Sequence, residues 1–113
     1  VRRICTGCKT ERYLTADEAE ALALSVPTGK RIKVYEGAGC FECRETGYRG
    51  RSGIFEILPI DEKVKEMIND EADAQLIKRE AVRRGMKTLR QAALRKLADG
   101  VPTYEEVVRV TAL

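Results

Sequence analysis

The residues best suited to chemistry in this sequence are four cysteines arranged as two C-x2-C pairs. They are Cys5, Cys8, Cys40 and Cys43, with 31 residues between the pairs. Paired C-x2-C motifs are typical of tetrahedral Zn²⁺, because each pair forms a tight turn that directs both sulfurs inward. Glycines in or beside these turns, Gly7 and Gly39 among them, let backbone amides approach the sulfurs. The spacing predicts a structural zinc site with four protein ligands and no open position for catalysis.

Other chemistries also fit four cysteines. Two local disulfides would need an oxidising compartment, and nothing in the sequence indicates secretion. A redox-active C-x-x-C pair usually stands alone at the start of a helix and needs no second copy. Iron and free thiols are further alternatives. Zinc is the reading that we favour.

Composition narrows the class of protein. The chain has 113 residues, enough for one compact domain or two very small ones. The absence of histidine excludes Ser-His and Cys-His catalysis and two-His metal sites within this chain. The net charge is +3, and it falls to about +1 if four thiolates bind one Zn²⁺. With aromatic residues at only 5%, this composition does not favour nucleic-acid binding.

The ends and the hydropathy of the chain lead to two expectations. No apolar run approaches the roughly 18 residues of a transmembrane helix, so we expect no direct insertion into a membrane. The first residue is Val1 rather than methionine, and we expect the chain to be a piece of a longer protein.

The elements that must position the cysteines are short. Thr15 and Glu18 have the spacing of a capping box and predict a helix that runs to Ser25. Residues 31–36 alternate apolar and charged side chains and predict a strand, whereas residues 47–53 predict a glycine-rich loop. Residues 54–58 predict a well-buried strand, and this chain offers it few partners. We therefore expect this strand to belong to a sheet that lies mostly outside the chain.

The second half of the sequence has helical periodicity. The predicted helices begin at Asp61, Asp73, Thr88 and Thr103. The expected fold is α+β: a tetracysteine zinc-binding module with short strands (residues 1–50), followed by a strand and a compact bundle of about four helices (residues 51–113).

Other constellations are weak. Gly29 and Lys30 match the Gly-Lys near the end of a phosphate-binding loop, but Arg31 follows where that motif needs Ser or Thr. The arginines Arg44 and Arg49, with Arg51, flank the second cysteine pair. They are either solvated or contact a phosphate, a nucleotide or a neighbouring subunit.

Several motifs together carry a resemblance. The cysteine pairs occur as RRxCxxC and GCxxC, then TGYRGRSGIFEIL follows, and the chain closes with RGMKTLR and TxEEVxRVT. This order resembles the C-terminal part of the type II secretion and type IV pilus assembly ATPases, over almost the whole chain.

The resemblance implies a division of labour. In that family a RecA-like core upstream binds ATP and Mg²⁺, and none of its motifs is present here, so we expect no catalysis from this fragment. By resemblance, the four cysteines bind structural zinc, residues 54–58 add a strand to the core sheet, and the helices after Asp61 contact neighbouring subunits of a homo-hexamer. Arg51 matches an arginine near the nucleotide pocket, and Arg44 and Arg49 are possible interface residues.

The resemblance also implies partners and a location. The partners are neighbouring subunits and an inner-membrane platform protein, with no nucleic acid, and the location is cytoplasmic, at the periphery of the inner membrane through these partners. The alternative is a stand-alone zinc-ribbon nucleic-acid-binding or adaptor protein, in which the arginines would contact phosphates.

Overall fold

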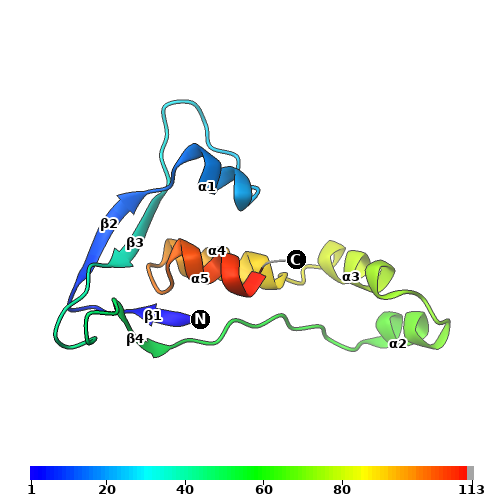
Figure 1. Cartoon of the computed structure of the whole chain (residues 1–113). Helices are drawn as coiled ribbons and strands as arrows, with labels where there is room; N and C mark the ends of the chain where they lie inside the picture. Colours follow the sequence, from blue (N-terminus) through cyan, green and yellow to red (C-terminus); the bar gives the residue numbers. More distant parts are fainter. Residues whose placement is uncertain (112–113) are drawn as a thin grey trace.

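The computed structural model describes residues 1–111, which form an α+β fold of short strands and helices (Figure 1). In chain order the elements are β1 (Arg2–Ile4), β2 (Lys9–Tyr13), α1 (Ala16–Ala21), β3 (Lys33–Gly37), β4 (Tyr48–Arg51), α2 (Glu62–Asn69), α3 (Ala74–Arg83), α4 (Leu89–Ala98) and α5 (Tyr104–Thr111). The predicted α+β class is confirmed. Every helix in this part of the chain is too short to cross a bilayer.

The strands form two antiparallel ribbons. β1 pairs with β4, and β2 pairs with β3 in a register that runs from Lys9 opposite Gly37 to Tyr13 opposite Lys33. The prediction of a strand within residues 31–36 is confirmed by β3. β1, β2 and β4 were not predicted, because they are short and rich in charge, and β4 lies where a loop was expected.

Residues 54–58 do not form the buried strand that the sequence predicted. They run as an extended connection without a strand partner among the described residues (Figure 1). Phe55 and Ile57 are 71% and 72% exposed. The predicted burial depends on a sheet outside this chain, so it stays a prediction.

The first helix begins as predicted and ends early. Thr15 and Glu18 make both bonds of the capping box. α1 ends at Ala21, with Leu22 as its C-cap, because Ala23 adopts a left-handed conformation (φ 55°), and the Leu24 N–H then bonds to the Ala19 carbonyl. The helix is therefore shorter than the predicted run to Ser25.

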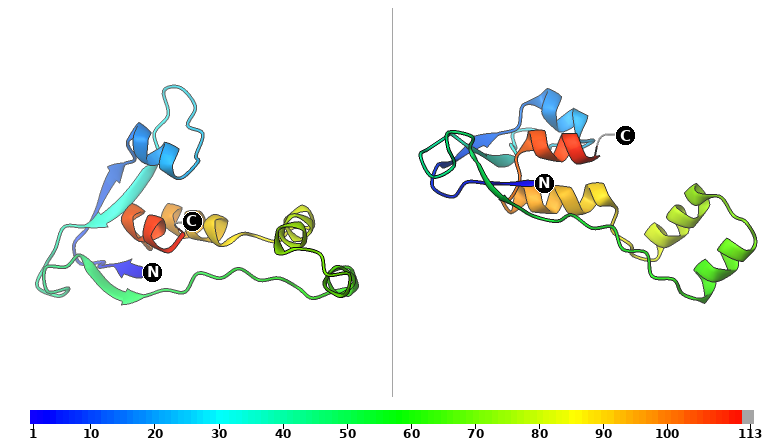
Figure 2. Two further views of the ribbon diagram at one scale, coloured as in Figure 1. Left: turned by 45° about the vertical axis from the view of Figure 1, so that its right-hand side comes forward. Right: turned by 60° about the horizontal axis from the view of Figure 1, so that its bottom comes forward.

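The four later helices begin at the predicted residues but form two pairs rather than one bundle. α2 packs on α3, and this pair stands away from the rest of the molecule (Figure 2). α4 packs on α5 and on β3. The fold is consequently elongated, with extents of 55 × 35 × 19 Å.

One hydrophobic core explains this arrangement. It joins residues from both halves of the sequence, namely Leu14, Leu22, Val34, Ala93, Leu97 and Val107. α4 and α5 pack their apolar faces against the β2–β3 ribbon. These faces are therefore not available to form a four-helix bundle with α2 and α3. The core thus holds β3, which leads into the second pair of cysteines.

Candidate metal centre

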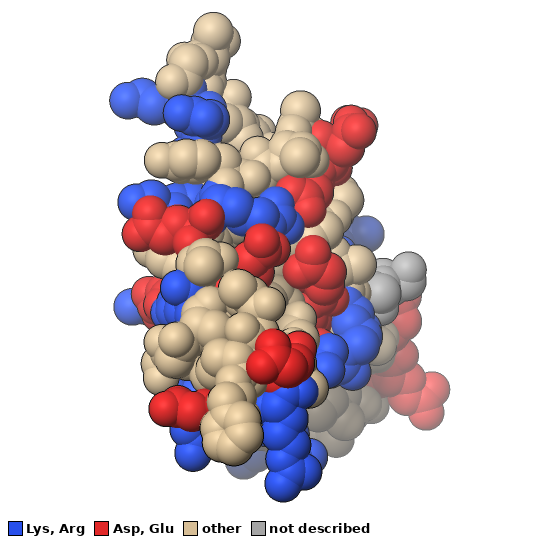
Figure 3. Space-filling model, turned by 60° about the vertical axis from the view of Figure 1, so that its left-hand side comes forward, with Lys and Arg blue, Asp and Glu red and all other residues tan. Residues whose placement is uncertain are grey.

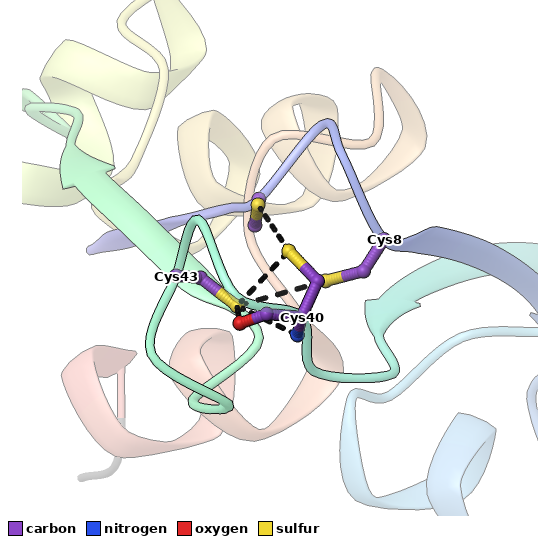
Figure 4. A group of neighbouring side chains, drawn as sticks. Cys8, Cys40 and Cys43 are labelled. Atoms are coloured by element: carbon purple, nitrogen blue, oxygen red, sulfur yellow. Dashed lines mark hydrogen bonds between the residues drawn. The ribbon is translucent and has the colours of Figure 1, made fainter.

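The four cysteine sulfurs lie together at the ends of the two ribbons. All four Sγ atoms lie within 4.8 Å of one another (Figure 4). The Sγ–Sγ distance is 3.7 Å for Cys5–Cys40, 3.8 Å for Cys8–Cys43 and 3.7 Å for Cys40–Cys43. A regular tetrahedron with metal–sulfur bonds of about 2.3 Å has edges of about 3.8 Å. The four cysteines could therefore hold one tetrahedral metal ion.

Strand pairing brings the two C-x2-C turns together. The first knuckle (residues 5–8) links β1 to β2, and the second knuckle (residues 40–43) lies between β3 and β4. Because β1 pairs with β4 and β2 with β3, both knuckles lie at the same end of the ribbons. The Cys5 N–H donates to the Gly47 carbonyl (2.9 Å) and the Ala38 N–H to the Cys8 carbonyl (3.0 Å), which fastens one knuckle to the other.

A close approach of two glycines makes this junction possible. A Cβ atom on Gly37 would lie 2.2 Å from the Gly47 carbonyl oxygen, and Gly47 itself has φ +81°. No side chain fits between these backbones. Gly37 thus allows β3 to end against the start of β4.

Backbone amides set the acidity of the sulfurs. Cys43 Sγ accepts hydrogen bonds from the N–H groups of Cys40 (3.3 Å) and Gly47 (3.2 Å). Burial raises the pKa of Cys43, but these two amides, together with the side chains of Cys40 and Cys8, outweigh it and lower that pKa to about 6. Cys8 receives one amide, from Gly39 at 3.3 Å, and burial raises its pKa to about 12. The amide donors favour the thiolate form, which is the form that binds metals.

The arrangement suits a structural role. Cys5 and Cys43 are buried, while Cys8 and Cys40 are half-buried. With four protein sulfurs around one centre, a bound metal keeps no position for water or substrate.

The structure separates the three arginines that the sequence grouped. Arg44 and Arg49 line a surface hollow beside the second knuckle, where Arg49 makes an ion pair with Glu42 at 3.4 Å. Arg51 is exposed on β4, opposite Arg2, and does not line this hollow. The roles suggested for these arginines stay predictions.

Sequence reasoning missed the role of one buried acid. Glu106 is only 1% exposed, and Arg2 and Arg109 both bond to its carboxylate. The hydrogen bonds from Arg109 and Arg2 lower the pKa of Glu106 to about 2, although burial opposes them. The Glu106 N–H donates to the Thr103 hydroxyl at 3.2 Å, at the start of α5. The local sequence could not predict that Arg2, 104 residues away, bonds to this carboxylate.

Comparison with known proteins identifies the family. The family model for type II/IV secretion system proteins matches residues 1–109. The type IV pilus assembly ATPase PilB of Myxococcus xanthus is 42% identical over 113 residues, which cover 98% of this chain and 20% of the relative. The type II secretion system protein E of Pseudomonas aeruginosa is 40% identical over 111 residues, 98% of this chain and 22% of the relative. The PilB ATPase of Thermus thermophilus is 40% identical over 98% of this chain and 12% of its own length.

This chain belongs to the type II/IV secretion system protein family. It spans about a fifth or less of the length of these curated relatives. The resemblance that the motifs indicated is confirmed.

Proposed function

We propose that this chain is the C-terminal zinc-binding and helical region of a longer secretion or pilus assembly ATPase, and that its role is structural. The observation that carries the proposal is the convergence of four cysteine sulfurs in a member of this family. Bound zinc would supply a cross-link between the two knuckles. ATP and Mg²⁺ would bind elsewhere in the longer protein, and this chain would do no catalysis.

The donor set supports zinc as the metal. Thiolates favour zinc, copper(I) and iron–sulfur chemistry over magnesium or calcium. Sulfur–sulfur distances of 3.7–3.8 Å agree with tetrahedral coordination at about 2.3 Å. Cys5, Cys8, Cys40 and Cys43 would be the ligands.

The extended segment supports continuity with a longer protein. Phe55 and Ile57 expose apolar side chains on backbone that has no strand partner in residues 1–111. A strand from the remainder of the protein would bury these side chains and complete the backbone hydrogen bonds. Residues 54–58 would then join the core sheet, with Arg51 at the end of β4 near the nucleotide.

Partners follow from the same proposal. The helices after Asp61 would contact neighbouring subunits of a homo-hexamer, which would work in the cytoplasm at an inner-membrane platform protein. Arg44 and Arg49 would be available for such contacts because both are exposed. On the face shown in Figure 3, positive and negative side chains alternate over the described residues, which does not favour the nucleic-acid alternative.

Metal analysis tests the zinc site. The chain, purified under reducing conditions, should contain one zinc per molecule by plasma mass spectrometry, and Co²⁺ substitution should give the visible spectrum of a tetrahedral S₄ site. Cys40→Ser should lose the metal, whereas Ser25→Ala, which replaces none of the four cysteines, should keep it. Absence of zinc from the reduced protein would refute the zinc assignment.

Activity measurements test the division of labour. The longer protein should hydrolyse ATP, and this chain alone should not. ATP hydrolysis by the isolated chain would overturn the structural role.

A further inference from the structure

We infer that the cysteine cluster is also a site of oxidative modification, at which peroxide converts the thiolates into two disulfides, Cys5–Cys40 and Cys8–Cys43, that cross between the knuckles. The pairing rests on the sulfur geometry alone. The accompanying release of zinc rests on the proposed function.

Contact distances support the cross-knuckle pairing. Four cysteines allow three complete pairings. Sulfur contacts of 3.7 and 3.8 Å occur for Cys5–Cys40 and Cys8–Cys43. The contact of 3.7 Å between Cys40 and Cys43 belongs to a different pairing, which would leave Cys5 to pair with Cys8 inside the first knuckle. In the cross-knuckle pairing both pairs are already in contact, and Figure 4 shows the sulfurs of Cys8, Cys40 and Cys43 lying together.

The two cysteines of each pair differ in burial, which gives them different roles in the oxidation. Cys40 and Cys8 are half-buried, whereas their partners Cys5 and Cys43 are buried. Peroxide would therefore reach Cys40 or Cys8 first, and the buried thiolate beside it would resolve the product.

The chemistry balances for each pair. The half-buried cysteine, as its thiolate, attacks hydrogen peroxide, the O–O bond breaks, and a sulfenic acid and one hydroxide form. The buried thiolate then attacks the sulfenic sulfur and displaces a second hydroxide as the S–S bond forms. Two thiolates lose two electrons in total, and one peroxide gains them. Two peroxides consume all four ligands, and a bound Zn²⁺ leaves.

The product would keep the two knuckles joined. Disulfides within each knuckle would close very short loops and leave the knuckles free to separate. Cross-knuckle disulfides join the same two segments that the metal joins. Oxidation would thus exchange one cross-link for another, and the module would stay folded.

Tryptic peptide mapping distinguishes these products. Trypsin should place both cysteines of the first knuckle in residues 4–9 and both of the second in residues 34–44, because basic residues flank each segment. After treatment of the 113-residue chain with hydrogen peroxide, we expect one species with the summed mass of both peptides less four hydrogens. Fragmentation of this species should assign Cys5–Cys40 and Cys8–Cys43. Two separate peptides, each two hydrogens lighter, or sulfinic and sulfonic products alone, would overturn the inference.

A variant pair supplies the rate. The double variant Cys8→Ser/Cys43→Ser retains Cys5 and Cys40, whereas Cys40→Ser/Cys43→Ser retains Cys5 and Cys8. Peroxide should form the disulfide of the first variant about tenfold faster than that of the second. Equal rates would overturn the inference, and the peptide map of the four-cysteine chain stands even if either variant folds poorly.

Zinc release separates this inference from the proposed function. A chromogenic chelator should detect zinc in step with disulfide formation. If the reduced protein holds no zinc but the linked peptides form, the zinc assignment fails and the pairing stands. If zinc is present but the peptides stay separate, the pairing fails alone.

Discussion

Arg2 and Glu106, 104 residues apart, are joined by three hydrogen bonds. The Arg2 amide donates to Glu106 Oε2 (2.8 Å), and the Arg2 guanidinium donates to Oε1 through Nε (3.0 Å) and Nη2 (2.8 Å). Arg109 donates to both oxygens of the same carboxylate from within α5. The first strand is therefore clamped to the last helix by one buried acid.

We predict that Glu106→Gln destabilises the chain by about 1–3 kcal/mol, because the amide N–H₂ would face donors that now meet a carboxylate. Thermal melting at neutral pH measures the loss. Glu105→Gln is the matched control, since Glu105 is 61% exposed and lies 3.6 Å from Arg12. That control should change stability by less than about 0.5 kcal/mol, and an equal loss in both variants would contradict the clamp.

The same carboxylate predicts a pH dependence. Because the pKa of Glu106 is lowered from 4.5 to about 2, its contribution is present above pH 4.5 and is lost as the pH falls toward 2. The difference in stability between the native chain and Glu106→Gln should therefore be largest above pH 5 and shrink in acid. Comparison with the variant matters because the pKa of Glu18 is also lowered to about 2, so acid weakens both proteins. A difference that grows in acid would contradict the prediction.

Metal removal should loosen more of the molecule than the strands next to the two knuckles. Chelation of the proposed zinc from the reduced chain should cost on the order of several kcal/mol. Because Val34 of β3 shares a core with Leu97 and Val107, amide hydrogen exchange should accelerate in α4 and α5 as well as in β1–β4. The α2–α3 pair, which packs apart from this core, serves as the internal control and should keep its exchange rates. Faster exchange confined to the strands would contradict the shared core.

Gly37→Ala should destabilise the knuckle junction by about 3 kcal/mol. Its Cβ would overlap the Gly47 carbonyl oxygen, which belongs to the backbone and cannot rotate away. Gly29→Ala is the control because Gly29 has φ +80° but no atom within 4 Å of the added Cβ, and it should cost about 1 kcal/mol from backbone strain alone. Chemical denaturation measures both, and a Gly37 variant no weaker than the Gly29 variant would contradict the close contact.

Ile57→Thr distinguishes this chain from the longer protein. Since Ile57 is 72% exposed, the substitution should change the stability of the isolated chain by less than about 0.5 kcal/mol. In the longer protein it should cost about 1 kcal/mol or more, because a buried strand position loses its packing. Equal and negligible effects in both proteins would contradict the proposed sheet.

The sequence by itself determined the local features. The two C-x2-C spacings specified which four residues converge, and the side chains at Asp61, Asp73 and Thr88 specified where three helices begin. Capping and turn formation involve groups only a few residues apart, so their free energies are decided within a short window.

The tertiary structure decided what the short windows could not. The pairing of β1 with β4, the Gly37–Gly47 contact and the Arg2–Glu106 clamp join residues that are far apart in the chain. Residues 54–58 are a further example. Their apolar pattern predicts a buried strand, but burial depends on the segments that lie beside them. Hydrophobic burial and backbone pairing are properties of two surfaces in contact, and a sequence pattern describes only one of them.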